Sequence, residues 1–281
     1  MRTVLSVHRT HDKCYLYNMS QYTDQLGRTV MQLHAPQRIV SLVPSLTELL
    51  YTLQLEQEVV GITRFCIHPS HWRQQKANIG GTKQVHVQQV QALQPHLVIA
   101  SKEENIKEQV EDISSFAAVW VSDINNYHQA LDAILSIGEM CNKQQAALQL
   151  VTHIQQQFAE ISTVEQPMSA AYLIWKDPYM TVGGDTFIHD MMQRCGLQNI
   201  FSHCTRYPTT TVEELQQSSC QVVILSSEPY PFREKHLADL QQQLPGKKII
   251  LANGEMFSWY GSRMLQAPAY FIGLLQRLQQ G

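Results

Sequence analysis

The stretch 38–48 has the pattern of a short buried strand that turns directly into a helix. Its apolar residues suit a parallel strand covered on both faces, and Pro44 favours an extended conformation for Val43. We expect Ser45 to be the helix N-cap, with Glu48 returning to its backbone N–H in a capping box. Ligands of open α/β sheets bind beyond the carboxyl ends of strands, where helix N-termini offer free N–H groups. Pro44 and Ser45 are therefore candidate ligand-binding residues, although the same turn could serve the fold alone.

From residue 38 onwards the chain alternates short apolar runs with amphipathic helical patterns, which is typical of βαβ units. A second alternation begins after residue 167. The expected strands are 39–43, 59–63, 97–101, 118–122, 171–175, 222–226 and 248–252, and the expected helices are 45–53, 85–93, 104–116, 186–195, 212–217, 232–243 and 262–279. The predicted fold class is α/β: two Rossmann-like βαβ lobes with a ligand cleft between them.

Between the two alternations lies a proline-free stretch, 127–161, in which apolar residues recur at the spacing of one helix face. A single helix of this length would be roughly 50 Å long. We expect one long rigid helix that joins the lobes. The predicted domains are an N-terminal lead-in over 1–36, an N-terminal α/β lobe over 37–125, the connecting helix over 126–163 and a C-terminal α/β lobe over 164–281.

Composition limits the partners of the chain. With 281 residues and 44% hydrophobic residues it can bury a substantial core, and a formal net charge of -3 gives no basic field for nucleic acid. No apolar run approaches the roughly 18 residues that span a bilayer, so we expect no membrane span. The cysteines are scattered without a CxxC pair, and we expect reduced structural thiols. They are Cys14, Cys66, Cys141, Cys195, Cys204 and Cys220.

The first residues begin like a signal peptide, but charged and histidine residues from His8 to Lys13 interrupt any apolar segment. As the chain stands, the expected location is the cytoplasm.

Several motifs follow one another in an order that is more specific than any one of them. They cover 24–28, 39–48, 60–63, 93–100, 183–188, 195–200 and 208–215. Together they resemble the Fe/cobalamin-type substrate-binding proteins of ABC importers, the class III receptors with a helical backbone. The resemblance extends from about residue 22 to the end of the chain.

The resemblance implies two lobes on a rigid helical backbone, a monomer, and a periplasmic location. It implies that a metal chelate (cobalamin, a ferric siderophore or haem) is captured and delivered to a membrane permease, with no covalent chemistry and no cofactor of the protein's own. In the cobalamin-binding members a second-lobe aromatic residue packs on the corrin, and it matches Tyr207. The facing first-lobe aromatic falls near Thr82. The two glutamates that dock such proteins to their permease match Glu213 and, on the first lobe, Gln88, which lacks the charge.

Residues 255–263 follow the last expected strand and should lie at the mouth of the cleft. Their aromatic side chains suit a large planar ring, and Arg263 could pair with a carboxylate or phosphate of the ligand. The candidates here are Phe257, Trp259, Tyr260 and Arg263. The aromatic residues could instead be helix-cap packing. Glu228 and Tyr230 are candidates in the loop that follows the expected strand 222–226. The neighbouring prolines could merely fix the conformation of that loop.

Further candidates are expected to face the same cleft. Arg64, Phe65 and Cys66 follow the second strand, and Trp175, Tyr179, Arg206 and Tyr207 approach from the other lobe. Three converging arginines would suit an acidic ligand such as a tetrapyrrole with propionates, although any of them could be a solvated surface charge.

Cys66, His68 and His71 are residue types that bind zinc, but their spacing fits no established pattern and a fourth ligand is missing. We expect no directly bound metal ion.

The leading hypothesis is a binding protein, not an enzyme, for a corrinoid or related chelate. A ferric siderophore or haem is the first alternative, with axial haem ligation by Tyr179, Tyr207, Tyr230 or Tyr260. A second alternative is a cytosolic corrinoid-handling enzyme or chaperone without a transporter. Glu228 and Glu255 could then form a carboxylate pair, but no nucleophile elbow, P-loop or HExxH motif supports catalysis.

Overall fold

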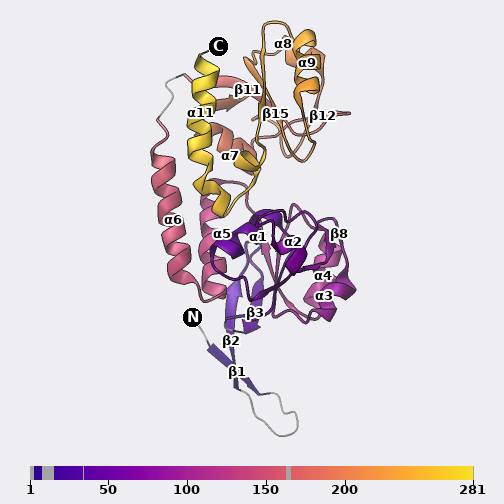
Figure 1. Cartoon of the computed structure of the whole chain (residues 1–281), viewed down its shortest axis with the longest axis vertical. Helices are drawn as coiled ribbons and strands as arrows, with labels where there is room; N and C mark the ends of the chain where they lie inside the picture. Colours follow the sequence, from indigo (N-terminus) through magenta and orange to yellow (C-terminus); the bar gives the residue numbers. More distant parts are fainter. Residues whose placement is uncertain (1–2, 8–15, 34, 163–165, 281) are drawn as a thin grey trace. The chain divides into compact units, whose positions relative to one another are not determined.

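The computed structural model describes residues 3–7, 16–33, 35–162 and 166–280 (Figure 1). The chain divides into two compact units. Unit 1 comprises Met1–Asp123 and Leu131–Thr152, and unit 2 comprises Ile124–Ala130 and His153–Gly281. Cys14, and residues 1–2 and 8–13 of the N-terminal stretch, lie outside the described residues.

Unit 1 is built on a parallel sheet of five strands in the order β10-β9-β4-β5-β6. Both β4 and β9 are buried along their whole length, as the apolar sequence of a doubly covered strand requires. The strands are β4 (Ile39–Ser41), β5 (Val59–Ile62), β6 (Ala77–Asn78), β9 (Leu97–Ser101) and β10 (Ala118–Ser122). The connecting helices are α1 (Pro44–Thr52), α2 (Trp72–Gln75), α3 (Val87–Ala92) and α4 (Lys107–Ser114), and β7 (Gly80–Gly81) pairs with β8 (Gln84–Val85).

Unit 1 also carries an antiparallel sheet of β1 (Thr3–Val7), β2 (Leu16–Thr23) and β3 (Thr29–Leu33), where the sequence predicts only a lead-in. The turn between β2 and β3 is held by Asp24, whose Oδ1 accepts hydrogen bonds from the backbone N–H groups of Leu26 (3.0 Å) and Arg28 (2.8 Å). Gly27 supplies the positive φ of 77° in this turn.

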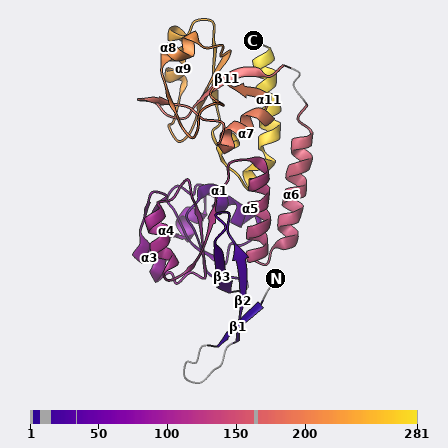
Figure 2. The same cartoon turned by 180° about the vertical axis from the view of Figure 1, so that it is seen from behind.

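The expected single helix over 127–161 is two helices, α5 (Tyr127–Met140) and α6 (Gln144–Ala159). The break lies at Asn142, which adopts a left-handed φ of 55°, while the Lys143 N–H donates to the Gly138 carbonyl (2.6 Å). Figures 1 and 2 show the two helices side by side. A Cβ at Gly138 would lie 2.3 Å from the Cβ of Ala147, so glycine is required for this approach. The apolar spacing continues through the turn and therefore conceals it.

Unit 2 is built on a parallel sheet in the order β13-β11-β15-β16. Its strands are β11 (Met168–Leu173), β13 (Leu197–Asn199), β15 (Val222–Ser226) and β16 (Lys248–Ala252), and β12 (Tyr179–Met180) pairs antiparallel with β14 (Thr209–Thr210). The helices are α7 (Phe187–Arg194), α8 (Val212–Gln217), α9 (Glu234–Gln243), α10 (Glu255–Ser258), the 3-10 turn Ser262–Leu265 and α11 (Ala267–Gln279). The expected helix 262–279 is thus a 3-10 turn followed by a helix. One core cluster packs the sheet residues Ala171, Val223 and Ile249 against Leu240 of α9.

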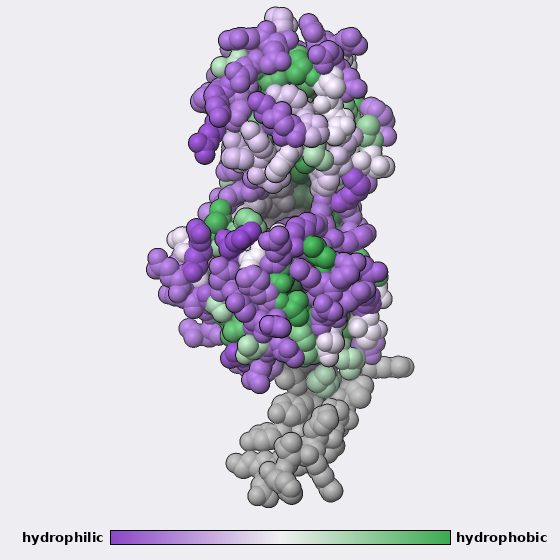
Figure 3. All heavy atoms as spheres, turned by 90° about the vertical axis from the view of Figure 1, so that its right-hand side faces the viewer, coloured by the Kyte–Doolittle hydropathy of each residue, from purple (hydrophilic) through white to green (hydrophobic). Residues whose placement is uncertain are grey.

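The parallel sheets confirm the predicted α/β fold class. Among the described residues, no helix is both long enough and apolar enough to cross a membrane. The face in Figure 3 is mostly hydrophilic, with hydrophobic residues in small scattered groups.

Candidate functional site

The junction between β4 and α1 differs from its predicted form. Helix α1 begins at Pro44, its N-cap is Val43 (φ −127°, ψ 121°), and no side chain caps it. The Ser45 hydroxyl is buried and has no hydrogen-bond partner among the described residues. The predicted Ser45 cap and capping box are therefore wrong. Proline at the first helical position, where its missing N–H costs nothing, starts the helix before Ser45.

Cys66 lies inside the loop after β5 rather than on its surface. Its Sγ is 3.0 Å from Thr47 Oγ1 and 3.2 Å from Thr63 Oγ1, and the residue is fully buried. Burial raises the pKa of the Cys66 thiol, so it stays protonated at neutral pH. The structure gives Cys66 a packing role in unit 1.

The three residues considered for zinc, Cys66, His68 and His71, do not form a metal-binding group. His71 Nε2 lies 3.1 Å from Glu56 Oε1, whereas the Cys66 thiol contacts the hydroxyls of Thr47 and Thr63. Within the described ranges, no three His, Cys, Asp or Glu side chains are grouped to hold a metal ion.

Arg64 and Phe65 do form an exposed group on unit 1. The Arg64 guanidinium carbon lies 5.0 Å from the centre of the Phe65 ring, which is 48% exposed. A Cβ at Gly81 would lie 3.1 Å from the Phe65 ring and 3.4 Å from Arg64, so the glycine strand β7 lets both side chains lie against the backbone. This pair offers an aromatic face beside a cation.

The aromatic group of unit 2 consists of Trp175, Tyr179 and Tyr230, which follow β11 and β15. The Trp175 ring is 41% exposed, and its centre lies 5.7 Å from that of Tyr230 at an angle of 70°. The Tyr230 N–H donates to the Ile174 carbonyl (3.2 Å), which joins the two strand ends. Tyr179 and Tyr230 are half-buried against the core, and burial raises the pKa of Tyr179. Trp175 therefore has the largest open surface of the group.

A second cluster of unit 2, the acid–arginine group, consists of Glu228, Glu255, Ser258, Trp259 and Arg263. Arg263 Nη1 lies 3.3 Å from Glu255 Oε2, and the guanidinium carbon lies 5.3 Å from the Trp259 ring centre. Arg263 is only 7% exposed. Because this cation is already paired with a carboxylate and largely buried, it differs from the open anion-binding residue that the sequence predicts.

Glu228 joins this group through Ser258, whose Oγ donates to Glu228 Oε1 (2.6 Å). Burial is the main cause that raises the pKa of Glu228, and the charge of Glu255 raises it further. Hydrogen bonds from Ser258 and Trp259 and the charge of Arg263 oppose the rise. The structure thus brings Glu228 and Glu255 together, which sequence could not establish. Ser258 was missed, although it was the polar residue between the predicted aromatics.

Among the predicted aromatics of 255–263, Phe257 is fully buried and packs on Tyr172 (5.1 Å between ring centres) and Phe271 (4.7 Å). The helix-packing alternative is therefore right for Phe257. Trp259 and Tyr260 retain 8% and 7% exposure, and Tyr260 meets Phe187 edge-on at 5.8 Å.

Arg206 and Tyr207 lie in a loop of unit 2. Arg206 has a positive φ of 55°, its Nη1 donates to Asn125 Oδ1 (3.1 Å), and its guanidinium carbon lies 5.4 Å from the Tyr207 ring centre. Asn125 was missed as its partner because it is distant in sequence. Arg206 is exposed and Tyr207 is half-buried.

The two predicted docking positions are both exposed in the first turn of a helix, Gln88 on α3 and Glu213 on α8. Helix α8 carries a true capping box, in which the Thr211 hydroxyl accepts from the Glu214 N–H (3.2 Å) and the Glu214 carboxylate accepts from the Thr211 N–H (3.1 Å).

Comparison with known proteins adds to this geometry. A family described as "Periplasmic binding protein" matches residues 39–248. The chain belongs to this periplasmic binding protein family. Among curated relatives, it is 22% identical over 254 residues to the "Vitamin B12-binding protein" of Pectobacterium atrosepticum, covering 87% of this chain and 90% of the relative.

The chain is also similar to a substrate-binding lipoprotein and to a heme-binding protein. The chain is 27% identical over 201 residues to the "Uncharacterized ABC transporter substrate-binding lipoprotein YvrC" of Bacillus subtilis, covering 67% of this chain and 63% of the relative. The periplasmic heme-binding protein HutB of Vibrio cholerae has the same fold, with a TM-score of 0.72, 22% identity, and coverage of 85% of this chain and 98% of that one. The predicted family of substrate-binding proteins is confirmed.

Proposed function

We propose that this chain is the substrate-binding protein of an ABC-type importer and binds a metal chelate without covalent chemistry, a corrinoid before other chelates. The exposed Trp175 ring, held edge-on by Tyr230, is the observation that carries the proposal. The similarity to a vitamin B12-binding protein and to an ABC transporter substrate-binding lipoprotein supports it.

A corrin is a large ring with a broad apolar face, and such a face gains most from flat aromatic partners. Trp175 and Phe65 are both large aromatic side chains with an open surface. Burying that surface stabilises a complex by about 25 cal/mol per Å². Each of the two residues therefore offers a ring surface, one in each unit.

Charge favours a ligand without acidic groups at the acid–arginine group. Arg263 is paired with Glu255, and Glu228 adds a second acid to the group. A ligand carboxylate placed there would meet two acids and one cation that already has a partner. The amide-rich rim of a corrinoid avoids this repulsion.

Haem is the second candidate, and it is favoured by a different observation. Arg64 and Arg206 each lie beside an aromatic ring, Phe65 and Tyr207, and both guanidinium groups suit a propionate. The heme-binding protein with the same fold agrees with this alternative.

Permease docking and a periplasmic location belong to the same proposal. Glu213 offers one carboxylate to a permease arginine, whereas Gln88 offers an uncharged amide. We therefore expect docking with fewer charge-assisted contacts than in a protein with two glutamates.

The proposal is tested by mixing the purified protein with cyanocobalamin, haem or a ferric hydroxamate, removing unbound ligand on a desalting column, and recording visible absorbance. Retention of the corrinoid alone supports the proposal, and retention of haem alone supports the second candidate. Retention of none of the three contradicts both. Chemical change of the retained ligand, lost in Glu228→Gln, would instead establish an enzyme.

A further inference from the structure

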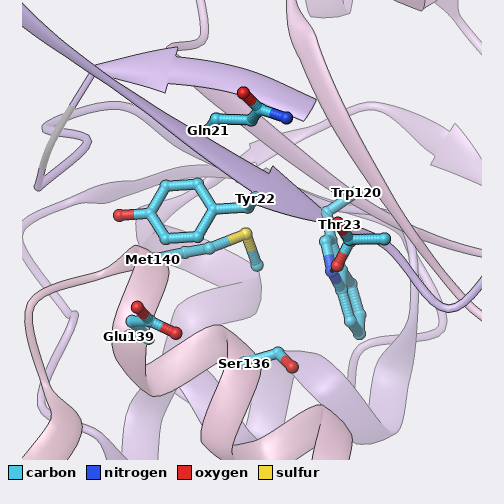
Figure 4. Close-up of a pocket in the computed structure, with 7 residues that line it drawn as sticks. All are labelled: Gln21, Tyr22, Thr23, Trp120, Ser136, Glu139 and Met140. Carbon is cyan, nitrogen blue, oxygen red and sulfur yellow. Dashed lines mark hydrogen bonds between the residues drawn. The ribbon is translucent and has the colours of Figure 1, made fainter. Parts of the chain in front are cut away.

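Unit 1 contains a pocket of about 350 Å³ between β2 and α5 (Figure 4). Tyr22 lies on one side of it, and Ser136, Glu139 and Met140 lie on the other. Among the described residues that line the pocket, Glu139 alone is charged, and this residue is exposed. A single exposed carboxylate does not make a binding site, so we assign no ligand to this pocket.

His236 of α9 is a buried histidine in unit 2 that the chelate-binding proposal does not use. The residue is 6% exposed, and two aromatic rings of the loop after β15 meet its ring edge-on. The ring centre lies 5.5 Å from that of Tyr230 and 5.6 Å from that of Phe232. Both distances lie in the favourable range for edge-to-face pairs. The imidazole of His236 is therefore part of the packing that supports this loop.

Two polar contacts fix the orientation of the His236 ring. The N–H of Arg233, the N-cap residue of α9, donates to Nδ1 (3.0 Å), so the neutral ring carries its hydrogen on Nε2. Nε2 lies 3.4 Å from the Tyr230 hydroxyl oxygen, to which it donates. In a capping box the position three residues after the N-cap is held by Glu or Gln, which makes only the first of these contacts. The histidine thus links the start of α9 to Tyr230.

Tyr230 in turn connects His236 to Trp175. The Tyr230 ring centre lies 5.7 Å from that of Trp175 at an angle of 70°, and the Tyr230 N–H donates to the Ile174 carbonyl (3.2 Å). Because 41% of Trp175 is open to solvent, the orientation of its ring depends on the side chains that it does contact. A change at His236 therefore reaches Trp175 through one intervening ring.

The surroundings of His236 favour its neutral form. Burial is the main cause that lowers the pKa of His236 below the usual 6.5. The positive charges of Lys235, Lys176 and Arg233 lower it further, and the negative charge of Asp239 opposes them. At neutral pH the ring is therefore uncharged, and its Nδ1 is available to accept the Arg233 N–H.

We propose that His236 is a positioning residue for the chelate site: it holds Tyr230, and Tyr230 sets the orientation of the exposed Trp175 ring. The proposal rests on the proposed function only for the role of Trp175 in binding. The effect of His236 on the Trp175 ring exists without a ligand, so the two proposals can be tested separately.

The ligand-free protein tests the positioning directly. With 5-fluorotryptophan incorporated, the fluorine-19 resonance of Trp175 is identified by its absence in Trp175→Phe. His236→Gln keeps an acceptor for the Arg233 N–H, whereas His236→Leu fills a similar volume and accepts no hydrogen bond. At pH 8 we expect the Trp175 resonance of His236→Gln to lie close to that of the parent protein and that of His236→Leu to be displaced. Equal resonances in the two variants would overturn the proposal.

A pH titration of the same resonance gives a readout that a purely structural role would not move. The His236 ring is neutral above pH 6.5 and gains its proton as pH falls through the lower pKa of the folded state. Because the cation cannot accept the Arg233 N–H, the Trp175 resonance should move below pH 6.5 in the parent protein. It should move equally in His203→Gln, which replaces an exposed histidine of unit 2, but not in His236→Gln. The same movement in His236→Gln would contradict the proposal.

Cyanocobalamin affinity at pH 8 completes the test. It should fall severalfold in His236→Leu and be unchanged in His236→Gln and His203→Gln. Unchanged affinity in His236→Leu would overturn the positioning role while the corrinoid proposal stands. No binding by the parent protein would contradict the corrinoid proposal, and the fluorine resonances would still decide whether His236 positions Trp175.

Discussion

Arg263 and Glu255 form an ion pair of 3.3 Å inside unit 2, with side chains that are 8% and 16% exposed. The arginine that the sequence offers as an anion-binding residue is thus already engaged within the protein. A buried pair of this kind fixes the geometry of its neighbours, here Trp259 and Glu228, more than it attracts a charged ligand.

Removal of Arg263 should destabilise the protein. Arg263→Met leaves Glu255 and Glu228 as neighbouring acids without their cation, and we expect the free energy of unfolding to fall by about 3 kcal/mol. Urea denaturation of Arg263→Met and of the double variant with Glu255→Gln measures the effect. If the pair is as described, the double variant recovers part of the loss. A single variant as stable as the parent chain would contradict this account of the pair.

Because of Glu228, the free energy of unfolding should decrease as pH rises. Its pKa is raised above the usual 4.5, so the folded state holds a proton that the unfolded state releases first. The contribution of Glu228 is full below pH 4.5 and is lost progressively as pH rises through the higher folded pKa. Glu228→Gln keeps an acceptor for Ser258 and should flatten this part of the pH profile, whereas Glu213→Gln, at an exposed site, should not. Denaturation between pH 4 and 8 tests the difference, and identical profiles for parent and Glu228→Gln would refute it.

Two glycines in helices should respond to alanine in opposite directions. Gly138→Ala places a Cβ 2.3 Å from the Cβ of Ala147 and should cost about 1–3 kcal/mol by separating α5 from α6. Gly273→Ala in α11 meets no atom within 4 Å and should stabilise by roughly 0.5–1 kcal/mol. Thermal and urea unfolding of both variants compare them directly. A neutral Gly138→Ala would mean that the helices do not approach as closely as described.

The corrected N-cap gives a further test. Thr211→Ala removes a cap hydrogen bond from α8 and should cost about 1 kcal/mol. Ser45→Ala removes a buried hydroxyl that has no hydrogen-bond partner and should leave stability unchanged or slightly higher. A loss at Ser45 as large as at Thr211 would restore the cap predicted from sequence.

Sequence patterns predicted the bounds of the strands best where the strands are buried in a sheet. The bounds of β9, β10, β15 and β16 agree with the expected ranges because each is a short apolar run in a covered parallel sheet. The break at Asn142 was missed because both helices keep one apolar face through the turn. The sheet at the N-terminus was missed because its strands are mixed in polarity and their pairing is decided by tertiary contacts.

The sequence supplies candidate residues near strand ends, but it does not predict which of their side chains are exposed. Trp175 and Phe65 are open, as a ligand-facing role requires, whereas Phe257 and Cys66 are buried. Sequence places residues near a strand end, but packing decides which of them point outward. The partnership of Arg263 with Glu255 likewise depends on the turn between α10 and the 3-10 turn, which no local pattern specifies.

The most direct test of the central claim is a fluorescence titration of the protein with cyanocobalamin, compared with Trp175→Ala and with Tyr51→Ala as a control at an aromatic residue of similar exposure. We predict saturable binding that weakens at least about tenfold, or ~1.4 kcal/mol, in Trp175→Ala and is unchanged in Tyr51→Ala. Binding that is equally strong in Trp175→Ala, or no binding by the parent protein, would contradict the proposed corrinoid site.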